Sequence, residues 1–183
     1  MSRIFTLLRA SLVTMAVALA MPPAALAQTA PVSELEAAFL INFARFTTWP
    51  PEESRAPLTL CVAGDDRVAD ALEAAVRGQA IDGRALVARA LRSSDHVHDC
   101  QVLFVGRGAP QAGEQALQRA QARAILTVSD REGFAQTGGI IEFVIDGGRM
   151  RFIINAGAAA RAGLRISSRL LGLAKVVYGT PHF

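Results

Sequence analysis

Two nearly unbroken apolar runs of strand length, 58–63 and 102–105, constrain the fold of this chain more than any other feature. A strand carries such a run, instead of alternating apolar and polar residues, when both faces of its sheet are covered. The apolar segments 85–91 and 124–128, each bounded by turn residues, are also predicted as strands. A sheet of this kind needs helices packed on both sides.

Helical patterns alternate with these strands, and the pattern changes near residue 140. There, Asp146-Gly147-Gly148-Arg149 lies between two apolar segments, which is a β-hairpin signal. The sequence therefore predicts an α/β fold: a single three-layer domain with a mostly parallel sheet, helices on both faces and a C-terminal antiparallel hairpin. The segments behind this prediction are helices over 69–76, 111–122, 155–162 and 167–177, and hairpin strands over 140–145 and 150–154. A short segment over 131–135 is expected to be capped by the residues before it.

The first helix of the domain is predicted to begin at Ser33. In the stretch Ser33-Glu34-Leu35-Glu36, the side chains of Ser33 and Glu36 would satisfy each other's backbone amides, as in a capping box. Aromatic residues follow near helical spacing, and they predict either a core face or an exposed patch that binds a partner or a second copy. They are Phe39, Phe43, Phe46 and Trp49.

The first 27 residues have the three parts of a cleavable secretory signal. Arg3 and Arg9 give a basic start, Ala10 to Met21 is apolar, and Ala25-Leu26-Ala27 is a small-x-small ending. The apolar run is shorter than the ~20 residues that a membrane-spanning helix needs, which disfavours an uncleaved anchor. The mature protein is therefore predicted to be the single domain 28–183, located outside the cytoplasm.

The composition indicates which compartment the protein works in and which partners it is not expected to bind. Lys175 is the only lysine among 19 basic residues, which is typical of a GC-rich bacterial coding sequence and indicates the periplasm. Removing the signal takes away two arginines and no acid, so the formal net charge falls from +3 to +1. A nucleic-acid-binding protein needs a clustered basic face, and here the charges are interspersed. Nucleic acid is therefore not an expected partner.

The chain has two cysteines, Cys61 and Cys100. In an oxidising compartment an even count favours a disulfide, and two cysteines allow one intramolecular pairing. The alternative is a pair of buried free thiols. The disulfide requires the strands over 58–63 and 102–105 to be neighbours.

Two short segments are candidate sites of chemistry. The stretch from Asp95 to Cys100 includes His96 and His98, but it matches no closed zinc pattern, and a disulfide would remove Cys100 as a ligand, so no metal is expected. Gly106-Arg107-Gly108 lies between a strand and a helix but lacks the third glycine of a dinucleotide fingerprint. A strand-to-helix turn explains it better.

A weaker candidate is an anion or ligand site made from two segments. Ser129 and Asp130 follow a predicted strand, at the end of the sheet where open α/β folds bind ligands. Arg165 and Ser167 precede a predicted helix, whose N-terminal amides favour anions. Helix caps and a salt bridge explain the same four residues. No catalytic set is expected, and the chemistry alone favours a binding protein.

The order of the motifs resembles the YfiR family of periplasmic proteins, and the resemblance covers nearly the whole mature chain. The matching stretches are residues 37–50, 60–65, 102–106, 125–130, 133–134, 138–141, 151–155 and 162–171. The resemblance implies a repressor, not a catalyst, that binds the periplasmic region of an inner-membrane diguanylate cyclase and holds it inactive. No cofactor is expected. An outer-membrane lipoprotein would sequester such a repressor.

The resemblance also bears on the cysteines. Relatives are redox-sensitive through disulfides, and Cys61 and Cys100 match one family pair, whereas a second pair has no counterpart here. The expected function is therefore cyclase inhibition that lowers cyclic-di-GMP signalling and biofilm formation. The alternative is a periplasmic small-ligand sensor or an accessory protein of an outer-membrane transport system.

Overall fold

The computed structural model describes residues 31–51, 57–92, 94–108, 110–120 and 123–179. The predicted signal, residues 1–27, lies outside these ranges. No helix within the described part of the chain is both long enough and apolar enough to cross a membrane. In chain order the elements are α1 (Val32–Arg45), β1 (Thr47–Thr48), β2 (Leu58–Ala63), α2 (Asp66–Val76), β3 (Ala80–Ile81), β4 (Arg84–Leu91), the 3-10 turn η2 (Ser94–Asp99), β5 (Val102–Val105), α3 (Pro110–Ala120), β6 (Leu126–Ser129), β7 (Ile141–Asp146), β8 (Arg149–Asn155), α4 (Ala156–Arg161), β9 (Arg165–Ile166), α5 (Ser168–Leu171) and β10 (Val176–Tyr178).

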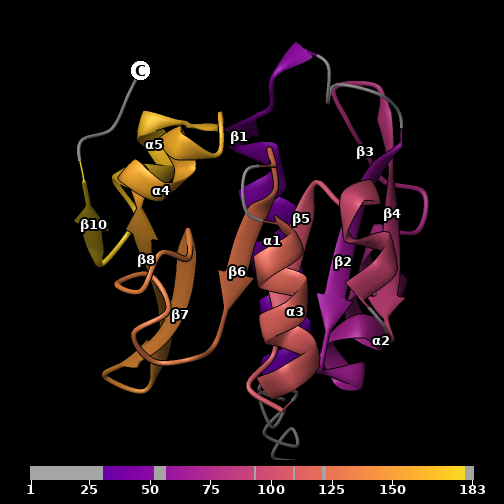
Figure 1. Cartoon of the computed structure of the whole chain (residues 1–183), viewed down its shortest axis with the longest axis horizontal. Helices are drawn as coiled ribbons and strands as arrows, with labels where there is room; N and C mark the ends of the chain where they lie inside the picture. Colours follow the sequence, from indigo (N-terminus) through magenta and orange to yellow (C-terminus); the bar gives the residue numbers. More distant parts are fainter. Residues whose placement is uncertain (1–30, 52–56, 93, 109, 121–122, 180–183) are drawn as a thin grey trace, which may run out of the picture.

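An eight-stranded sheet in the order β10-β8-β7-β6-β5-β2-β4-β3 forms the middle layer (Figure 1). The pairs β2–β4, β2–β5, β5–β6, β6–β7 and β8–β10 are parallel, whereas the hairpin β7–β8 and the pair β3–β4 are antiparallel. In the sheet, β4 lies on one side of β2 and β5 lies on the other side. The chain therefore proceeds in opposite directions across the sheet from the point between β2 and β5. This is the topological switch point of an open α/β sheet.

Helices cover the sheet on both faces, as the continuous apolar strands predict. On β2, Leu60 and Val62 belong to the core shared with α1 and α2, whereas Cys61 and Ala63 belong to a second core with α3 and η2. Figure 1 shows α3 in front of the sheet and α1 behind it. The strands over 58–63 and 102–105 are adjacent, with Cys61 opposite Leu103. The predicted fold class is therefore confirmed.

The capping-box prediction is wrong. α1 begins one residue earlier, at Val32 after Pro31, and no side chain caps it. Ser33 therefore lies inside the first turn, where its hydroxyl is not in the capping position. Glu36 faces inward and is buried, so it does not return to the Ser33 amide.

Two predicted helical segments near the C-terminal half also differ. The helix expected over 167–177 is only the short α5, which ends at Leu171 with Gly172 as its C-cap, and the chain then adds β10 beside β8. Val176, Val177 and Tyr178 have branched or aromatic side chains that favour strands, and the open edge of β8 supplies their pairing. The segment 131–135 consists of turns instead of a short helix.

Candidate functional site

The carboxyl ends of β2, β5 and β6 place three charged residues at one edge of the sheet. Asp65 follows β2 and caps α2, accepting from the amides of Arg67 at 3.0 Å and Val68 at 3.2 Å. Arg107 follows β5 and binds Asp130, which follows β6. The Arg107 amide donates to Asp130 Oδ1 at 2.9 Å, and Arg107 Nε donates to Oδ2 at 2.6 Å. These charges hold the turns together.

The turns after β2 and β5 approach each other closely at the switch point. A Cβ atom added to Gly106 would lie 2.9 Å from the carbonyl oxygen of Gly64, and one added to Gly108 would lie 3.0 Å from the same oxygen. The turns after β2 and β5 therefore pack directly on each other.

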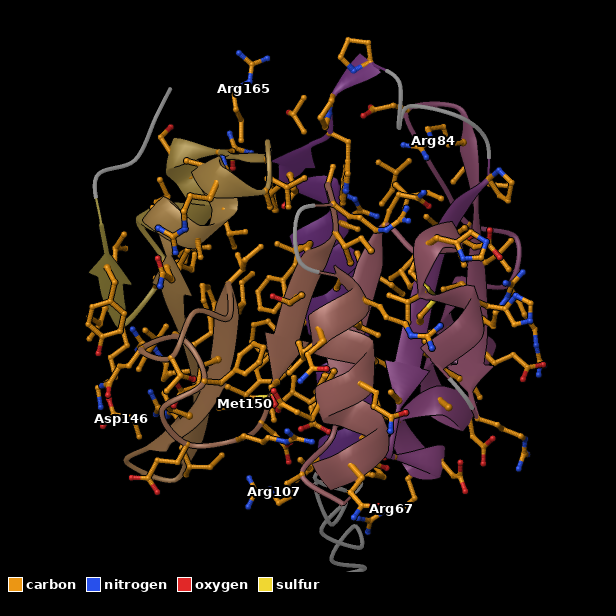
Figure 2. The ribbon with its side chains drawn as sticks, viewed as in Figure 1. Arg67, Arg84, Arg107, Asp146, Met150 and Arg165 are labelled. Atoms are coloured by element: carbon orange, nitrogen blue, oxygen red, sulfur yellow. A yellow bond between two sulfur atoms is a disulfide. The ribbon has the colours of Figure 1, made fainter. Side chains whose placement is uncertain are left out.

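The structure does not join the four residues of the predicted anion site. Ser129 is fully buried, and its hydroxyl donates to the Val105 carbonyl at 2.7 Å and accepts from the Arg131 amide at 3.1 Å. Ser167 caps α5 by accepting from the Leu170 amide at 3.3 Å. Figure 2 shows Arg165 at one end of the molecule and Arg107, the partner of Asp130, at the other. The two segments lie at opposite ends of the sheet, so the four residues do not form one site, and anion binding at either segment stays a prediction.

Glu36 is a buried carboxyl whose surroundings the sequence did not predict, because the pattern placed this residue in a helix cap. Its side chain is only 6% exposed. The pKa of this carboxyl is raised to about 7, first by burial and then by the nearby charges of Asp130 and Asp65, whereas Arg107 and Arg67 act to lower it. Glu36 therefore titrates near neutral pH at the same edge of the sheet.

Glu142 on β7 is a second missed carboxylate. It is 3% exposed and accepts from the amides of Gly133 and Ala135, both at 3.0 Å. Glu142 thus holds two amides of the turns over 131–137, whose other amides at 134, 136 and 137 donate to carbonyls within the turns. Its position in an apolar strand next to a glycine-rich loop is the signal that could have indicated this role.

We expect Glu142→Ala to lower the free energy of unfolding by about 2 kcal/mol, because two buried amides lose a charged acceptor. Glu142→Gln keeps one acceptor oxygen and should lose less. Urea unfolding measures both changes, and amide hydrogen exchange at Gly133 and Ala135 should become faster in the alanine variant. Unchanged exchange at these two amides would contradict the anchoring role.

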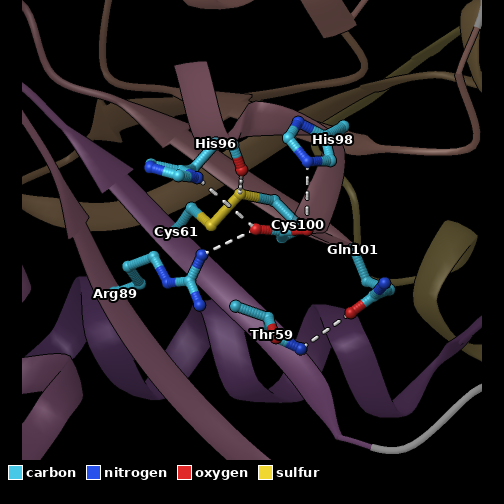
Figure 3. Close-up of a disulfide and its surroundings, with 8 residues drawn as sticks. Thr59, Cys61, Arg89, His96, His98, Cys100 and Gln101 are labelled. Atoms are coloured by element: carbon cyan, nitrogen blue, oxygen red, sulfur yellow. Dashed lines mark hydrogen bonds and ion pairs between the residues drawn. A yellow bond between two sulfur atoms is a disulfide. The ribbon is translucent and has the colours of Figure 1, made fainter. Parts of the chain in front are cut away.

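In the histidine-rich segment, the side chains form an ion-pair network around Asp99 (Figure 3). Asp99 lies 2.9 Å from Arg89 Nη1, 3.3 Å from His98 Nε2 and 3.8 Å from His96 Nδ1. Within the described residues, no group of three or more histidine, cysteine or acidic side chains is placed to hold a metal ion. Asp99 therefore links η2 to β4.

Cys61 and Cys100 form the predicted disulfide (Figure 3). Their Cα atoms are 5.8 Å apart, within the usual range for a bridge. Both residues are buried, at 0% and 2% exposure. Beside the bridge, the Thr59 amide donates to Gln101 Oε1 at 2.7 Å. The bridge thus ties β2 to the segment that enters β5.

The aromatic residues of α1 divide between core and surface. Phe43 is fully buried, and its ring centroid lies 5.6 Å from that of Phe143 and 5.1 Å from that of Phe152. Trp49 is also buried, at 7% exposure. Phe39 and Phe46 are partly buried at the edge of this core. Phe43 and Trp49 are therefore core residues, and of the four aromatics only Phe39 and Phe46 reach the surface.

An exposed apolar surface extends from Phe39 towards the start of α1. Phe39 lies 5.8 Å from both Phe143 and Phe152, measured between ring centroids. Leu35 is one helical turn before Phe39, and Ile145 is two residues beyond Phe143 on the same face of β7, so both continue this surface. Val32, Leu35 and Ile145 are 60%, 41% and 67% exposed. Met150 is partly buried and lies opposite Ile145 across the hairpin. The α1–hairpin patch consists of Val32, Leu35, Phe39, Ile145 and Met150.

These features define the class of protein: a three-layer α/β domain with an open sheet, stapled by one buried disulfide, whose charged clusters hold turns together. Within that class, the chain belongs to the YfiR/HmsC-like family, whose model matches residues 33–175. The family consists of periplasmic regulators rather than catalysts, and it indicates a role in cyclic-di-GMP signalling.

Solved structures with a similar fold include an ABC domain in complex with L-Trp from Streptococcus pneumonia and a conserved domain protein from Vibrio cholerae O1 biovar El Tor str. N16961. Their TM-scores are 0.51 and 0.50, each at 13% sequence identity. The matches cover 77% and 79% of this chain, and the chain spans 60% of the length of both. At this identity the likeness shows the fold alone.

Proposed function

We propose that the protein is a periplasmic repressor that binds the periplasmic region of an inner-membrane diguanylate cyclase and holds the enzyme inactive. The observation that carries the proposal is the family match over residues 33–175. The buried disulfide supports an oxidising compartment. An outer-membrane lipoprotein that competes for the repressor would release the cyclase.

The α1–hairpin patch is the surface we propose for the cyclase. Contiguous exposed apolar side chains tend to mark interfaces. Of the predicted partner surface, the patch includes Phe39, whereas Phe43 and Trp49 are buried and do not belong to it. Aromatic and aliphatic anchors at the centre of an interface carry most of its binding energy. A homodimer through the same patch would compete with the cyclase.

We expect deletion of the gene to raise cellular cyclic-di-GMP and biofilm formation, and the wild-type gene to restore both. The double variant Leu35→Asp/Ile145→Asp should fail to restore them, because it places charges in the apolar patch. Leu173→Asp is the matched control, since Leu173 is 58% exposed and lies outside the patch. Periplasmic protein levels and thermal unfolding should be the same for all variants.

Two outcomes separate the parts of this proposal. An unchanged cyclic-di-GMP level after deletion, with the cyclase expressed, would contradict the repressor function. Full repression by the patch variant would leave the function standing and would contradict the patch as the cyclase surface. Light scattering on the purified protein would show whether a homodimer exists and whether the patch variant dissociates it.

A further inference from the structure

A cleft of about 460 Å³ opens on the α3 side of the sheet, above β6. It exists because α3 packs over β2 and β5, whereas the chain after β6 forms turns over 131–139 instead of another covering helix. Ile125, Thr127 and Ile140 line the cleft from the sheet, Phe134 from the turns and Ala158 from α4. The volume lies within the range of small-molecule sites.

Arginines from three separate segments line the same cleft. Arg123 precedes β6, Arg131 follows it, and Arg161 lies in the last turn of α4. Arg131 is tied to the protein: it lies 4.0 Å from Glu114 and donates to the Gly106 carbonyl at 3.3 Å. Arg123 and Arg161 are exposed at the mouth. Glu114 and Glu132 are the acidic residues of the lining, so the cations outnumber the acids.

We propose that this cleft binds a small organic anion, a carboxylate or sulfonate attached to an apolar ring. The ring would lie on Ile125, Phe134 and Ile140, where burial removes apolar surface from water. The negative group would lie between the guanidinium groups of Arg123 and Arg161, whose planar donors suit carboxylate and sulfonate oxygens. The proposal does not depend on the cyclase, because the α1–hairpin patch lies on the opposite face of the sheet.

The test uses 8-anilinonaphthalene-1-sulfonate, an anionic probe whose fluorescence rises in apolar surroundings. We expect saturable binding to the purified secreted protein at low salt. The double variant Arg123→Glu/Arg161→Glu should weaken this binding at least tenfold. The matched control Arg149→Glu/Arg151→Glu makes the same change in net charge outside the cleft and should stay within twofold of wild type.

Competition by a charged and a neutral ligand distinguishes recognition of the anion from nonspecific hydrophobic binding. We expect 2-naphthoate to displace the probe at a concentration at least tenfold below that of its neutral counterpart, 2-naphthamide. The Leu35→Asp/Ile145→Asp variant should bind the probe as wild type does. The proposal is overturned by any one of four results: no saturable binding to wild type, equal loss in the two arginine variants, equal competition by the two naphthalenes, or loss of binding in the patch variant.

Discussion

Replacing Cys61 and Cys100 together by alanine is expected to lower the free energy of unfolding by about 4 kcal/mol without changing the fold. The bridge joins residues separated by 39 positions. Closing a loop of about 40 residues removes that much chain entropy from the unfolded state in the chain-entropy model. Alanine is the suitable replacement, because a serine hydroxyl at these buried positions would need a hydrogen-bond partner.

Urea unfolding of the double variant and of the wild-type protein under oxidising conditions measures the loss. Wild-type protein that is unfolded with an excess of reductant should behave like the double variant, because both lack the loop constraint. A loss below about 1 kcal/mol would show that the bridge contributes little, whatever its geometry. Circular dichroism of the double variant should keep the wild-type spectrum.

The burial of this bridge also bears on redox sensitivity. Cys61 and Cys100 are 0% and 2% exposed, so a reductant reaches the sulfur atoms only when the surrounding structure opens. We therefore interpret the bridge as structural. Under native conditions, thiol trapping should detect reduction no faster than opening of the β2–η2 region as measured by hydrogen exchange. Rapid reduction of the folded protein would instead favour a redox switch.

The sequence predicted the parts of the fold that depend on local pattern. Strands over 58–63 and 102–105 have the predicted bounds, because both carry continuous apolar runs, and their adjacency brings the two cysteines together. β10 was missed because its pairing depends on the distant edge of β8. The local sequence carries no information about that edge, so the spacing of apolar residues over 167–177 predicted a helix instead.

The candidate site was less predictable than the fold. Asp130 was correctly placed at the end of a strand, but its partner Arg107 comes from a neighbouring strand end and was interpreted only as a turn residue. Glu142 and Glu36 are isolated acids in apolar segments, and only the packed structure shows what surrounds them. Ser129 was expected at a strand end and Arg165 before a helix, and only the topology shows that these two segments lie at opposite ends of the sheet.

Glu36→Gln is expected to stabilise the protein above pH 7 by up to about 3 kcal/mol, and to have little effect below pH 4.5. The folded pKa of Glu36 is about 7, above its ordinary value of 4.5. Between these two values the folded state holds a proton that the unfolded state has released. The contribution of Glu36 to stability is therefore fully present below pH 4.5 and is lost as the pH rises towards 7.

Glutamine mimics the protonated carboxyl, so the variant should lack this loss, and its stability should depend less on pH between 4.5 and 7 than that of the wild type. Urea unfolding of both proteins at pH 5 and pH 8 measures the difference. Glu34→Gln is the matched control, because Glu34 is exposed on the same helix and should behave like wild type. Equal effects of the two substitutions would mean that net charge causes the change. An effect confined to Glu36→Gln would mean that the buried carboxyl, beside Asp65 and Asp130, is neutral in the folded protein at pH values below about 7.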